Sequence, residues 1–262
     1  MCDPEIMIRK WTCGNKNVDH CIKEFQLRTT RFENAIEWIP FDKLSITDKI
    51  GEGGFGCVYS ATWSDGIRKI VKTDDHYYVR SREPSSAVAL KTLSDYSLKE
   101  IKTNEYMMVF QYANSGNLYK FLRSNFRDLN WHAKLKLLHD ISGDLYQIHI
   151  TGYIHADFHS GNILQHKGIS ENMESNISDM GLSKKANEND SKGYIMSEMS
   201  TGQRPFDGYQ FNEELAVKIC IGLRPEFAQG TPECYIKLAK QCMEPDPKKR
   251  PNARQVSYEL RK

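Results

Sequence analysis

The sequence predicts an α+β fold with two unequal lobes, a smaller β-rich lobe followed by a larger helical one. Short runs of β-branched and aromatic residues between turn signals begin at Leu44. Apolar residues at steps of three and four, which are typical of amphipathic helices, follow after residue 114. Strands first and helices afterwards favour an α+β protein, and 262 residues are enough for two lobes that each bury a core.

Residues 1–43 are predicted to form a leader in front of the main domain. Apolar residues are scattered there among many charges, and the run from Asn34 to Ile39 ends at Pro40. Proline restricts the residue before it to an extended or turning conformation. We expect a short helical segment that packs on the main domain and has no separate function.

Three strands are predicted in the smaller lobe, over residues 57–63, 87–91 and 107–112. Each is a short run of β-branched, aromatic or other apolar residues. The first ends at the turn residues Ser64-Asp65-Gly66. Residues 72–86 are polar and contain proline and serine, so we interpret them as a surface loop.

Two helices are predicted in the larger lobe. The first has Asn130 as its N-cap and Gly152 as its stop. Its apolar stripe consists of Trp131, Leu135, Leu138, Ile141, Leu145 and Ile148. The second begins at Thr231-Pro232-Glu233, which combine a capping residue, a proline at the first position and an acid near the positive end of the helix dipole.

Composition excludes several classes of protein. The chain has 36 Lys and Arg against 34 Asp and Glu, so it has no global attraction to nucleic acid or anionic lipid. Its apolar runs are far shorter than the roughly 20 residues that span a bilayer. The N-terminus shows no signal peptide, and seven cysteines without a C-x-x-C pair indicate reduced thiols. We therefore expect an intracellular, cytoplasmic protein.

A glycine motif lies between Ile50 and Val58. Gly51, Gly53 and Gly56 have the spacing G-x-G-x-x-G, which lets backbone amides approach phosphate oxygens without interference from Cβ atoms. The same spacing occurs in dinucleotide sites and in ordinary turns. A dinucleotide site needs the glycines to open a helix, whereas these glycines lead into a predicted strand.

Three further motifs carry polar side chains. Lys91 follows Val-Ala-Leu at a strand end, where an ammonium can contact phosphates, although the chain has many surface lysines. Asp157 and Asn162 lie in one tight loop, where the carboxylate can orient a hydroxyl proton and the amide oxygen suits Mg²⁺. Asp179, in Asp-Met-Gly, is a second candidate Mg²⁺ ligand.

Each of these motifs alone is more often structural than functional, but together and in this order they resemble those of the eukaryotic protein kinases. The segment 242–251 also resembles the family's signature near the C-terminus. The resemblance covers about residues 44–262. It implies a two-lobed protein-kinase-like fold, with an N-lobe at about 44–110, a hinge at about 111–114 and a C-lobe at about 115–262.

The resemblance implies a role for each motif residue around MgATP. Lys91 would hold the α- and β-phosphates, Asp157 would orient the acceptor hydroxyl, and Asn162 and Asp179 would hold Mg²⁺. Phe110 falls at the gatekeeper position. The glycines that would cover the phosphates are Gly51, Gly53 and Gly56. The adenine pocket would be formed by Ile50, Val58, Ala89 and Leu164, with backbone groups of Gln111 and Ala113.

Lys72 is an alternative candidate for the lysine that contacts the phosphates. Lys91 lies further from the glycine motif than is usual in the family, and Lys72 lies at a more ordinary distance. We prefer Lys91 because the small Ala89 two residues earlier fits against adenine, and because a loop at 72–86 accounts for the extra length.

The chain departs from the family pattern before the hinge. The segment between Lys91 and the hinge strand is too short for both the helix and the strand that kinases have there. Glu100 is the best candidate for the glutamate that pairs with the lysine, although a solvated surface acid is an equally good interpretation.

Further departures follow the catalytic loop. No Ala-Pro-Glu follows Asp179. In the family, an aspartate on the central helix of the large lobe anchors the catalytic loop, and no matching aspartate is found in this sequence. Arg250, which would pair with the missing glutamate, is expected to be re-paired or exposed. Ala156 replaces an arginine that receives a phosphorylated loop, and His159 replaces a lysine.

Three hypotheses about function result. The first is a protein kinase that transfers phosphate from ATP, with Mg²⁺, to Ser, Thr or Tyr hydroxyls of a protein substrate. The second is a nucleotide-binding pseudokinase that acts as a scaffold for a signalling partner. The third is a shortened form of a longer kinase that folds poorly. No nucleic-acid or membrane partner is expected.

Overall fold

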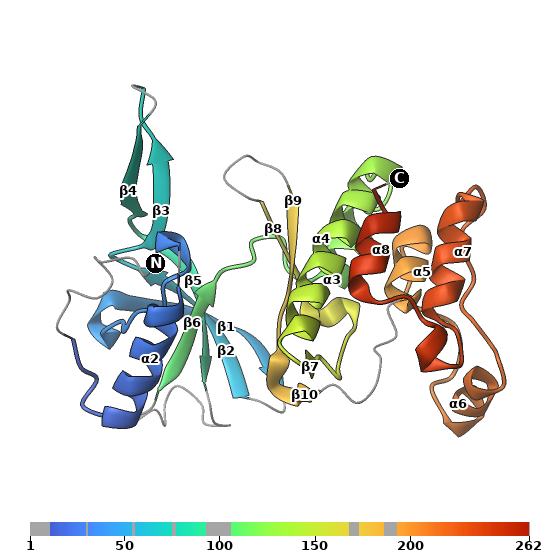
Figure 1. Cartoon of the computed structure of the whole chain (residues 1–262), viewed down its shortest axis with the longest axis horizontal. Coiled ribbons are helices and arrows are strands. Elements are labelled where there is room, and N and C mark those ends of the chain that lie inside the picture. Colours follow the sequence, from blue (N-terminus) through green and yellow to red (C-terminus); the bar gives the residue numbers. More distant parts are fainter. Residues whose placement is uncertain are drawn as a thin grey trace. The chain divides into compact units, whose positions relative to one another are not determined.

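The computed structural model describes residues 11–29, 31–53, 56–74, 77–92, 106–167, 173–185 and 193–261. The chain divides into two compact units, with the boundary between Tyr112 and Ala113 (Figure 1). The described part of unit 1 is mostly strands and that of unit 2 mostly helices, which confirms the predicted α+β class. No helix within the described residues combines the length and apolar character needed to cross a membrane.

Unit 1 is centred on an antiparallel sheet with the order β1-β2-β5-β6. Its strands are β1 (Leu44–Gly53), β2 (Gly56–Trp63), β5 (Ser86–Thr92) and β6 (Met107–Gln111), and the last three confirm the predicted strands. Alternate residues of β2 and β5 are buried on one face, because successive side chains of a strand point to opposite faces. This core consists of Cys57, Tyr59, Ala61, Trp63, Val88 and Leu90.

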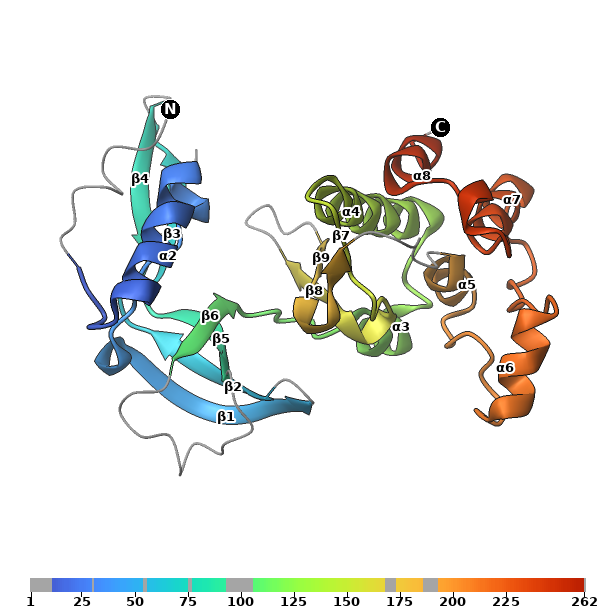
Figure 2. The ribbon, with the colours of Figure 1, turned by 60° about the horizontal axis from the view of Figure 1, so that its bottom comes forward.

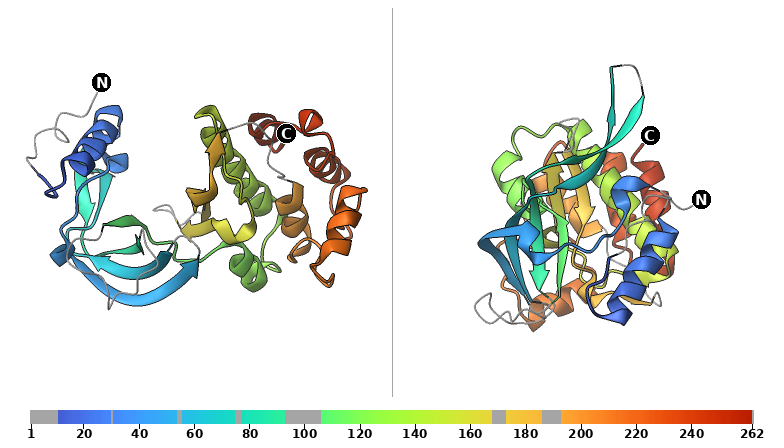
Figure 3. Two further views of the ribbon diagram at one scale, coloured as in Figure 1. Left: turned by 90° about the horizontal axis from the view of Figure 1, so that it is seen from below. Right: turned by 90° about the vertical axis from the view of Figure 1, so that its left-hand side faces the viewer.

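The prediction of a surface loop over 72–86 is wrong. The segment continues an antiparallel hairpin, with β3 (Ile67–Lys72) paired to β4 (Tyr78–Glu83) in a sheet of its own. The hairpin extends away from the four-stranded sheet (Figure 3, right). Most of its side chains are at least partly exposed to water, so no apolar alternation marked it in the sequence.

The leader is helical, but earlier than expected. The helix α2 (Lys16–Arg28) begins at Asn15, whose side chain accepts hydrogen bonds from two backbone N–H groups of the first turn. In the run from Asn34 to Ile39, Asn34 ends a short 3-10 helix, η1 (Phe32–Asn34), and residues 35–39 have no regular structure. They are fastened to the hairpin instead, because Glu37 forms ion pairs with Arg68 and Arg82 at 3.0 and 2.6 Å.

Unit 2 has a helical core. Its helices are α3 (Leu118–Asn125), α4 (Trp131–Ile150), α5 (Gly193–Thr201), α6 (Glu213–Cys220), α7 (Glu233–Cys242) and α8 (Ala253–Glu259). The long helix α4 confirms the predicted stripe, and Asn130 caps it by accepting a hydrogen bond from the Ala133 N–H at 2.9 Å. Helix α7 begins one residue later than predicted, since the Thr231 hydroxyl donates to the Ala228 carbonyl instead of capping.

Short strands surround the loop that contains the catalytic motif. They are β7 (Tyr153–Ile154), β8 (Ile163–Lys167), β9 (Met173–Ile177) and β10 (Lys184–Lys185). β7 pairs with β10, and β8 pairs with β9. Helix α4 runs along β9 (Figure 2). It fastens that strand at both ends, because Lys136 donates to the Met173 carbonyl at 2.7 Å and the Asp144 carboxylate accepts from the Ile177 N–H at 3.0 Å.

Candidate active site

In unit 1, the residues predicted to contact phosphates lie in one row across the sheet. Gly51 is paired with Val58, Val58 with Lys91, and Lys91 with Met108. Directly opposed residues of antiparallel strands project from the same face. The side chains of Val58, Lys91 and Met108 therefore share the less buried face of the sheet.

Ala89, predicted to line the adenine pocket, and Phe110, the predicted gatekeeper, lie on the adjacent part of this face. Ala89 is half-buried and is paired with Phe110, whose side chain is 48% exposed. Ile50 on β1 is also exposed. Gln111 ends β6 opposite Val88, so its backbone lies at the end of the strand that leads to unit 2.

Gly53 and Gly56 are paired at the tip of β1 and β2. Gly56 has a φ of 107°, a conformation that side chains larger than hydrogen rarely adopt. The backbone conformation at position 56 therefore requires glycine, in addition to any role of this residue in leaving room for a phosphate.

The two candidate lysines differ in position. Lys91 is half-buried on β5, an interior strand between β2 and β6. Lys72 is exposed at the end of β3, opposite Tyr78 in the separate hairpin, and does not belong to the four-stranded sheet. Only Lys91 shares a row with Gly51. Glu100, the predicted partner of the lysine, lies outside the described residues.

In unit 2, the loop after β7 begins at His155, which is completely buried. Its Nε2 lies 2.7 Å from the Ser178 carbonyl oxygen, and its Nδ1 accepts a hydrogen bond from the Asp157 N–H at 3.3 Å. Ala156 between them has a φ of 62°, a left-handed conformation that is costly for a residue with a Cβ. The Asp157 side chain is 42% exposed.

Asp157 and Asn162 meet, as their positions in the sequence predicted. The Asn162 side-chain amide donates to the Asp157 carbonyl at 3.0 Å and to its carboxylate at 3.1 Å. The Asn162 carbonyl accepts from both the backbone N–H and the hydroxyl of Ser178, at 2.8 and 3.1 Å. These bonds bring Asp179, the next residue, to the same end of the β8–β9 pair.

Asp179 also has a left-handed backbone, with φ 61° and ψ 62°. Non-glycine residues in this region are uncommon, and their strain is tolerated where the surroundings define the conformation. Asp157, Asn162 and Asp179 carry two carboxylates and one amide, oxygen-bearing groups of the kind that Mg²⁺ prefers. Within the described residues, no group of three His, Cys, Asp or Glu side chains offers an alternative metal centre.

His159 borders the candidate catalytic carboxylate. Its Nε2 lies 3.6 Å from Asp157 Oδ1, and its Nδ1 accepts a hydrogen bond from the Gly161 N–H at 3.0 Å. A Cβ on Gly161 would lie 2.6 Å from the imidazole, so glycine is needed for this ring position. The sequence indicates only that His159 replaces a lysine of the family, and it gives no sign of this contact with Asp157.

Three further residues of unit 2 were singled out in the sequence: Ala113, Leu164 and Arg250. Ala113 is the first residue of the unit, and its carbonyl accepts a hydrogen bond from the Gly116 N–H at 3.0 Å. Leu164 is half-buried on β8, where it bridges to Asn117. Arg250 is half-buried and re-paired, since it donates to the Glu244 carbonyl at 2.7 Å.

Two acids near the loop were not predicted. Asp144 holds the end of β9 that leads to Asp179, and burial raises the pKa of its carboxyl. Glu198 on α5 is 2% exposed, and burial raises the pKa of its carboxyl, while the Ser160 hydroxyl lowers it. Asp144 stands next to Leu145 of the predicted apolar stripe, and this position was a sequence signal of its burial. Glu198 is a single acid in a short apolar run, which gave little sign that it is buried.

Comparison with known proteins adds independent information. Residues 44–197 match the family model described as protein tyrosine and serine/threonine kinase. A protein of Acanthamoeba polyphaga mimivirus, named as a serine/threonine-protein kinase/receptor, is 27% identical over 264 residues that cover 86% of this chain and 16% of that protein.

Two proteins of Dictyostelium discoideum, named as the probable serine/threonine-protein kinases roco7 and pats1, are 24% and 27% identical over 271 residues each. These alignments cover 87% and 85% of this chain, but only 10% and 8% of the two relatives. The chain thus spans less than a fifth of the length of each of these three relatives. Because the family model matches more than half of the sequence, from Leu44 to Ser197, the chain belongs to the protein tyrosine and serine/threonine kinase family.

Proposed function

We propose that this chain is a catalytically active kinase domain that transfers the γ-phosphoryl group of MgATP to a Ser, Thr or Tyr hydroxyl of a protein substrate. The observation that carries the proposal is the hydrogen-bonded pair of Asp157 and Asn162, with Asp179 held next to it through Ser178. The proposal includes the intracellular setting expected from the sequence.

In this proposal, the polar residues of unit 2 prepare the acceptor. The Asp157 carboxylate is partly exposed and can accept a hydrogen bond from the substrate hydroxyl, which orients its oxygen for attack. The Asn162 amide keeps that carboxylate in one orientation. Asn162 and Asp179 would hold the cation, and MgATP supplies the phosphoryl group and neutralises charge when it is bound.

Unit 1 would bind the nucleotide along one face of its sheet. The Lys91 ammonium would neutralise phosphate charge, and Gly51 in the same row leaves room for the phosphates. Val58, Ala89 and Ile50 offer apolar surface for the adenine.

The central test is phosphate incorporation by the purified chain, with MgATP and a generic protein substrate such as casein. Wild type should incorporate phosphate, and Asp157→Asn should lower the rate at least about 100-fold, because an amide cannot accept the hydroxyl proton as a carboxylate does. Equal incorporation by the two proteins would refute catalysis by this site.

A matched pair of variants tests the lysine. Lys91→Met should weaken MgATP binding and abolish incorporation, whereas Lys72→Met, the same substitution on the exposed hairpin, should leave both unchanged. If Lys72→Met weakens MgATP binding and Lys91→Met does not, Lys72 is the lysine that contacts the phosphates. Thermal stability with and without MgATP measures the binding part separately from turnover.

A nucleotide-binding scaffold is the second candidate. It is favoured by the few residues between β5 and β6 and by the missing Ala-Pro-Glu. If MgATP stabilises the protein but wild type and Asp157→Asn incorporate phosphate equally, the scaffold is the better account. A broad, uncooperative unfolding transition would instead favour the shortened, poorly folding form.

A further inference from the structure

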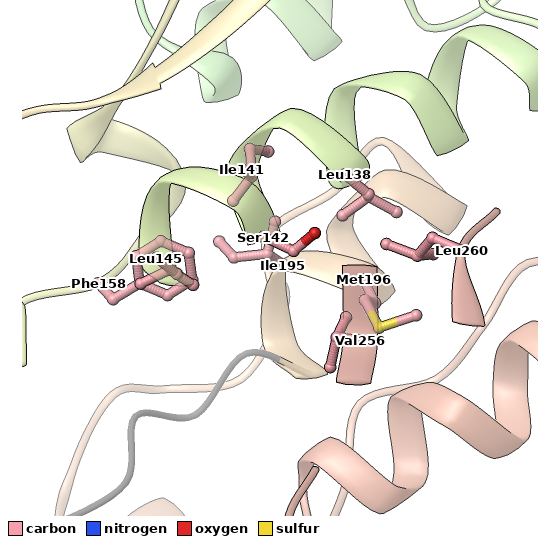
Figure 4. Close-up of a pocket in the computed structure, with 9 residues that line it drawn as sticks. All are labelled: Leu138, Ile141, Ser142, Leu145, Phe158, Ile195, Met196, Val256 and Leu260. Atoms are coloured by element: carbon pink, nitrogen blue, oxygen red, sulfur yellow. The ribbon is translucent and has the colours of Figure 1, made fainter. Parts of the chain in front are cut away.

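A small pocket lies among α4, α5 and α8 of unit 2 (Figure 4). Its lining side chains are apolar except for Ser142, whose hydroxyl donates to the His139 carbonyl of the same helix at 2.9 Å. A ligand site needs a few polar groups that fix the orientation of the ligand. The described residues of the lining provide no such group, so the pocket is a packing gap in the helical core.

The tip of the β3–β4 hairpin, in contrast, exposes aromatic and apolar side chains together. Tyr77 and Tyr78 are 74% and 73% exposed, and three aliphatic residues beside them are exposed as well: Ile70, Val71 and Val79. The hairpin extends away from the four-stranded sheet (Figure 3, right). Exposed large apolar residues are normal when they are scattered singly, whereas a contiguous group indicates a surface that meets another molecule.

The strand register divides the hairpin into two faces. Directly opposed residues of antiparallel strands project from the same face, and so do residues two positions apart along a strand. One face therefore carries six residues, of which four are cations and none is an acid, and we call it the basic face. Its opposed pairs are Arg68 with Arg82, Ile70 with Arg80 and Lys72 with Tyr78.

The leader covers the base of the basic face. The Glu37 carboxylate pairs there with Arg68 and Arg82. The guanidinium groups of Arg68 and Arg80 stack on Phe32 of η1, at 5.1 and 5.2 Å from the ring centroid. These contacts agree with the register, because all three arginines belong to the basic face.

Nearer the tip, Tyr78 is flanked by two cations of the basic face. Lys72 is directly opposite it on β3, and Arg80 follows two residues later on β4. All three side chains are exposed. Directly opposed side chains have Cβ atoms about 4.5–5.5 Å apart, and the next neighbours on the same face remain within reach of long side chains. Two cationic groups can therefore converge on a negative charge at the end of the Tyr78 ring.

We propose that Tyr78 is a phosphorylation site whose phosphate is held by Lys72 and Arg80. A protein tyrosine kinase would supply the phosphoryl group from MgATP. The tyrosine Oη attacks the γ-phosphorus, the bond from that phosphorus to the β–γ bridging oxygen breaks with its electron pair leaving on ADP, and the phenolic proton passes to a base of the kinase. The proposal concerns Tyr78 as the acceptor, so it does not depend on the proposed activity of this chain.

The phosphate and the two cations balance in charge. A tyrosine phosphate brings about −1.5 to −2 charges and three acceptor oxygens at neutral pH. Lys72 and Arg80 bring two positive charges to the same part of the face. Hydrogen bonds between ionised groups are shorter and stronger than those between neutral groups. The modified hairpin should therefore be more rigid at its tip than the unmodified one.

The hairpin presents Tyr78 on an accessible strand. In the part of the chain that the structure describes, β3 and β4 form a sheet of two strands, so one edge of β4 has no strand beside it. Such an edge can pair with a strand of another protein. Because this sheet is separate from the four-stranded sheet, an enzyme can bind the segment without disturbing the residues predicted to contact nucleotide.

Tyr77 provides an internal comparison. It is as exposed as Tyr78, but its carbonyl accepts a hydrogen bond from the Thr73 N–H at 2.8 Å, so its cross-strand neighbour is a threonine. A phosphate on Tyr77 would lack the directly opposed cation that Tyr78 has.

Phosphate mapping tests the acceptor. The full chain carrying Asp157→Asn, which removes its own proposed base, is incubated with MgATP and a purified tyrosine kinase of broad specificity, and tandem mass spectrometry identifies the modified residues. In this background, Tyr78→Phe should lower the initial incorporation at least about tenfold, whereas Tyr77→Phe should stay within about twofold. Incorporation that Tyr78→Phe leaves unchanged, or a phosphate that maps mainly to Tyr77, would overturn the proposal.

Amide hydrogen exchange tests the two cations. Phosphorylation of Tyr78 should slow the exchange of the amides of residues 78–82 about threefold, because charge-assisted hydrogen bonds hold the tip. Lys72→Met should abolish most of this change. Lys69→Met is the matched control and should keep the full change, since Lys69 lies on the other face of β3 and pairs with Glu83 at 3.6 Å. Equal changes in the two variants, or no change on phosphorylation of the protein without them, would overturn the assignment of the cations.

Discussion

Replacing Glu37 by glutamine should detach the leader from the β3–β4 hairpin. The Glu37 carboxylate bridges two arginines of the hairpin, with Arg68 Nε at 3.0 Å and Arg82 at 2.6 Å. The exposed fractions of the three side chains are 17%, 9% and 23% for Glu37, Arg68 and Arg82. Arg68 also stacks on Phe32, a leader residue, at 5.1 Å from the ring centroid.

The magnitude follows from this burial. Removing one partner of a buried ion pair costs about 3–5 kcal/mol, because the remaining charge loses its compensation. Here one acid compensates two guanidinium groups, but Arg82 retains some contact with water and glutamine keeps an acceptor oxygen. We therefore expect a loss of about 3 kcal/mol in the free energy of unfolding of unit 1.

The assay is urea unfolding followed by tryptophan fluorescence, since three of the four tryptophans (Trp11, Trp38 and Trp63) belong to unit 1. The matched control is Glu83→Gln, the same substitution on the same hairpin. Glu83 pairs with Lys69 at 3.6 Å and is 60% exposed, so its loss should cost less than about 0.5 kcal/mol. Equal losses in the two variants would refute the reasoning from burial.

Three further predictions concern single positions. Asp144→Ala should lose about 1–3 kcal/mol in urea unfolding, because the Ile177 N–H is left without its acceptor, whereas Asp144→Asn should stay near wild type; equal losses would contradict this role. Burial raises the pKa of Glu198 above its ordinary 4.5, so the folded state binds this proton more tightly than the unfolded chain does. The stability associated with that proton is present below pH 4.5 and is lost as pH rises through the raised pKa. The stability of Glu198→Gln relative to wild type should therefore increase from pH 4.5 to neutral pH, and a flat difference would contradict it. Gly66→Ala should destabilise the hairpin by more than about 1 kcal/mol, because Gly66 has a φ of 77° and an added Cβ would overlap the Glu83 carbonyl; an unchanged unfolding midpoint would contradict this.

Elements with strong local periodicity were predictable from the sequence. The alternation of β2 and β5, and the apolar stripe of α4, follow from burial on one face, and each is visible within a few neighbouring residues. The meeting of Asp157 with Asn162 was predictable for the same reason, because both residues lie in one tight loop.

Features that depend on distant partners were decided only by the tertiary structure. The β3–β4 hairpin has no apolar face, and its link to the leader depends on Glu37, far away in the sequence. The role of Asp144 likewise depends on Ile177, which another part of unit 2 brings to it. Local sequence patterns record which side of an element is buried, whereas the partner of a buried charge is chosen by packing between segments, which no local pattern records.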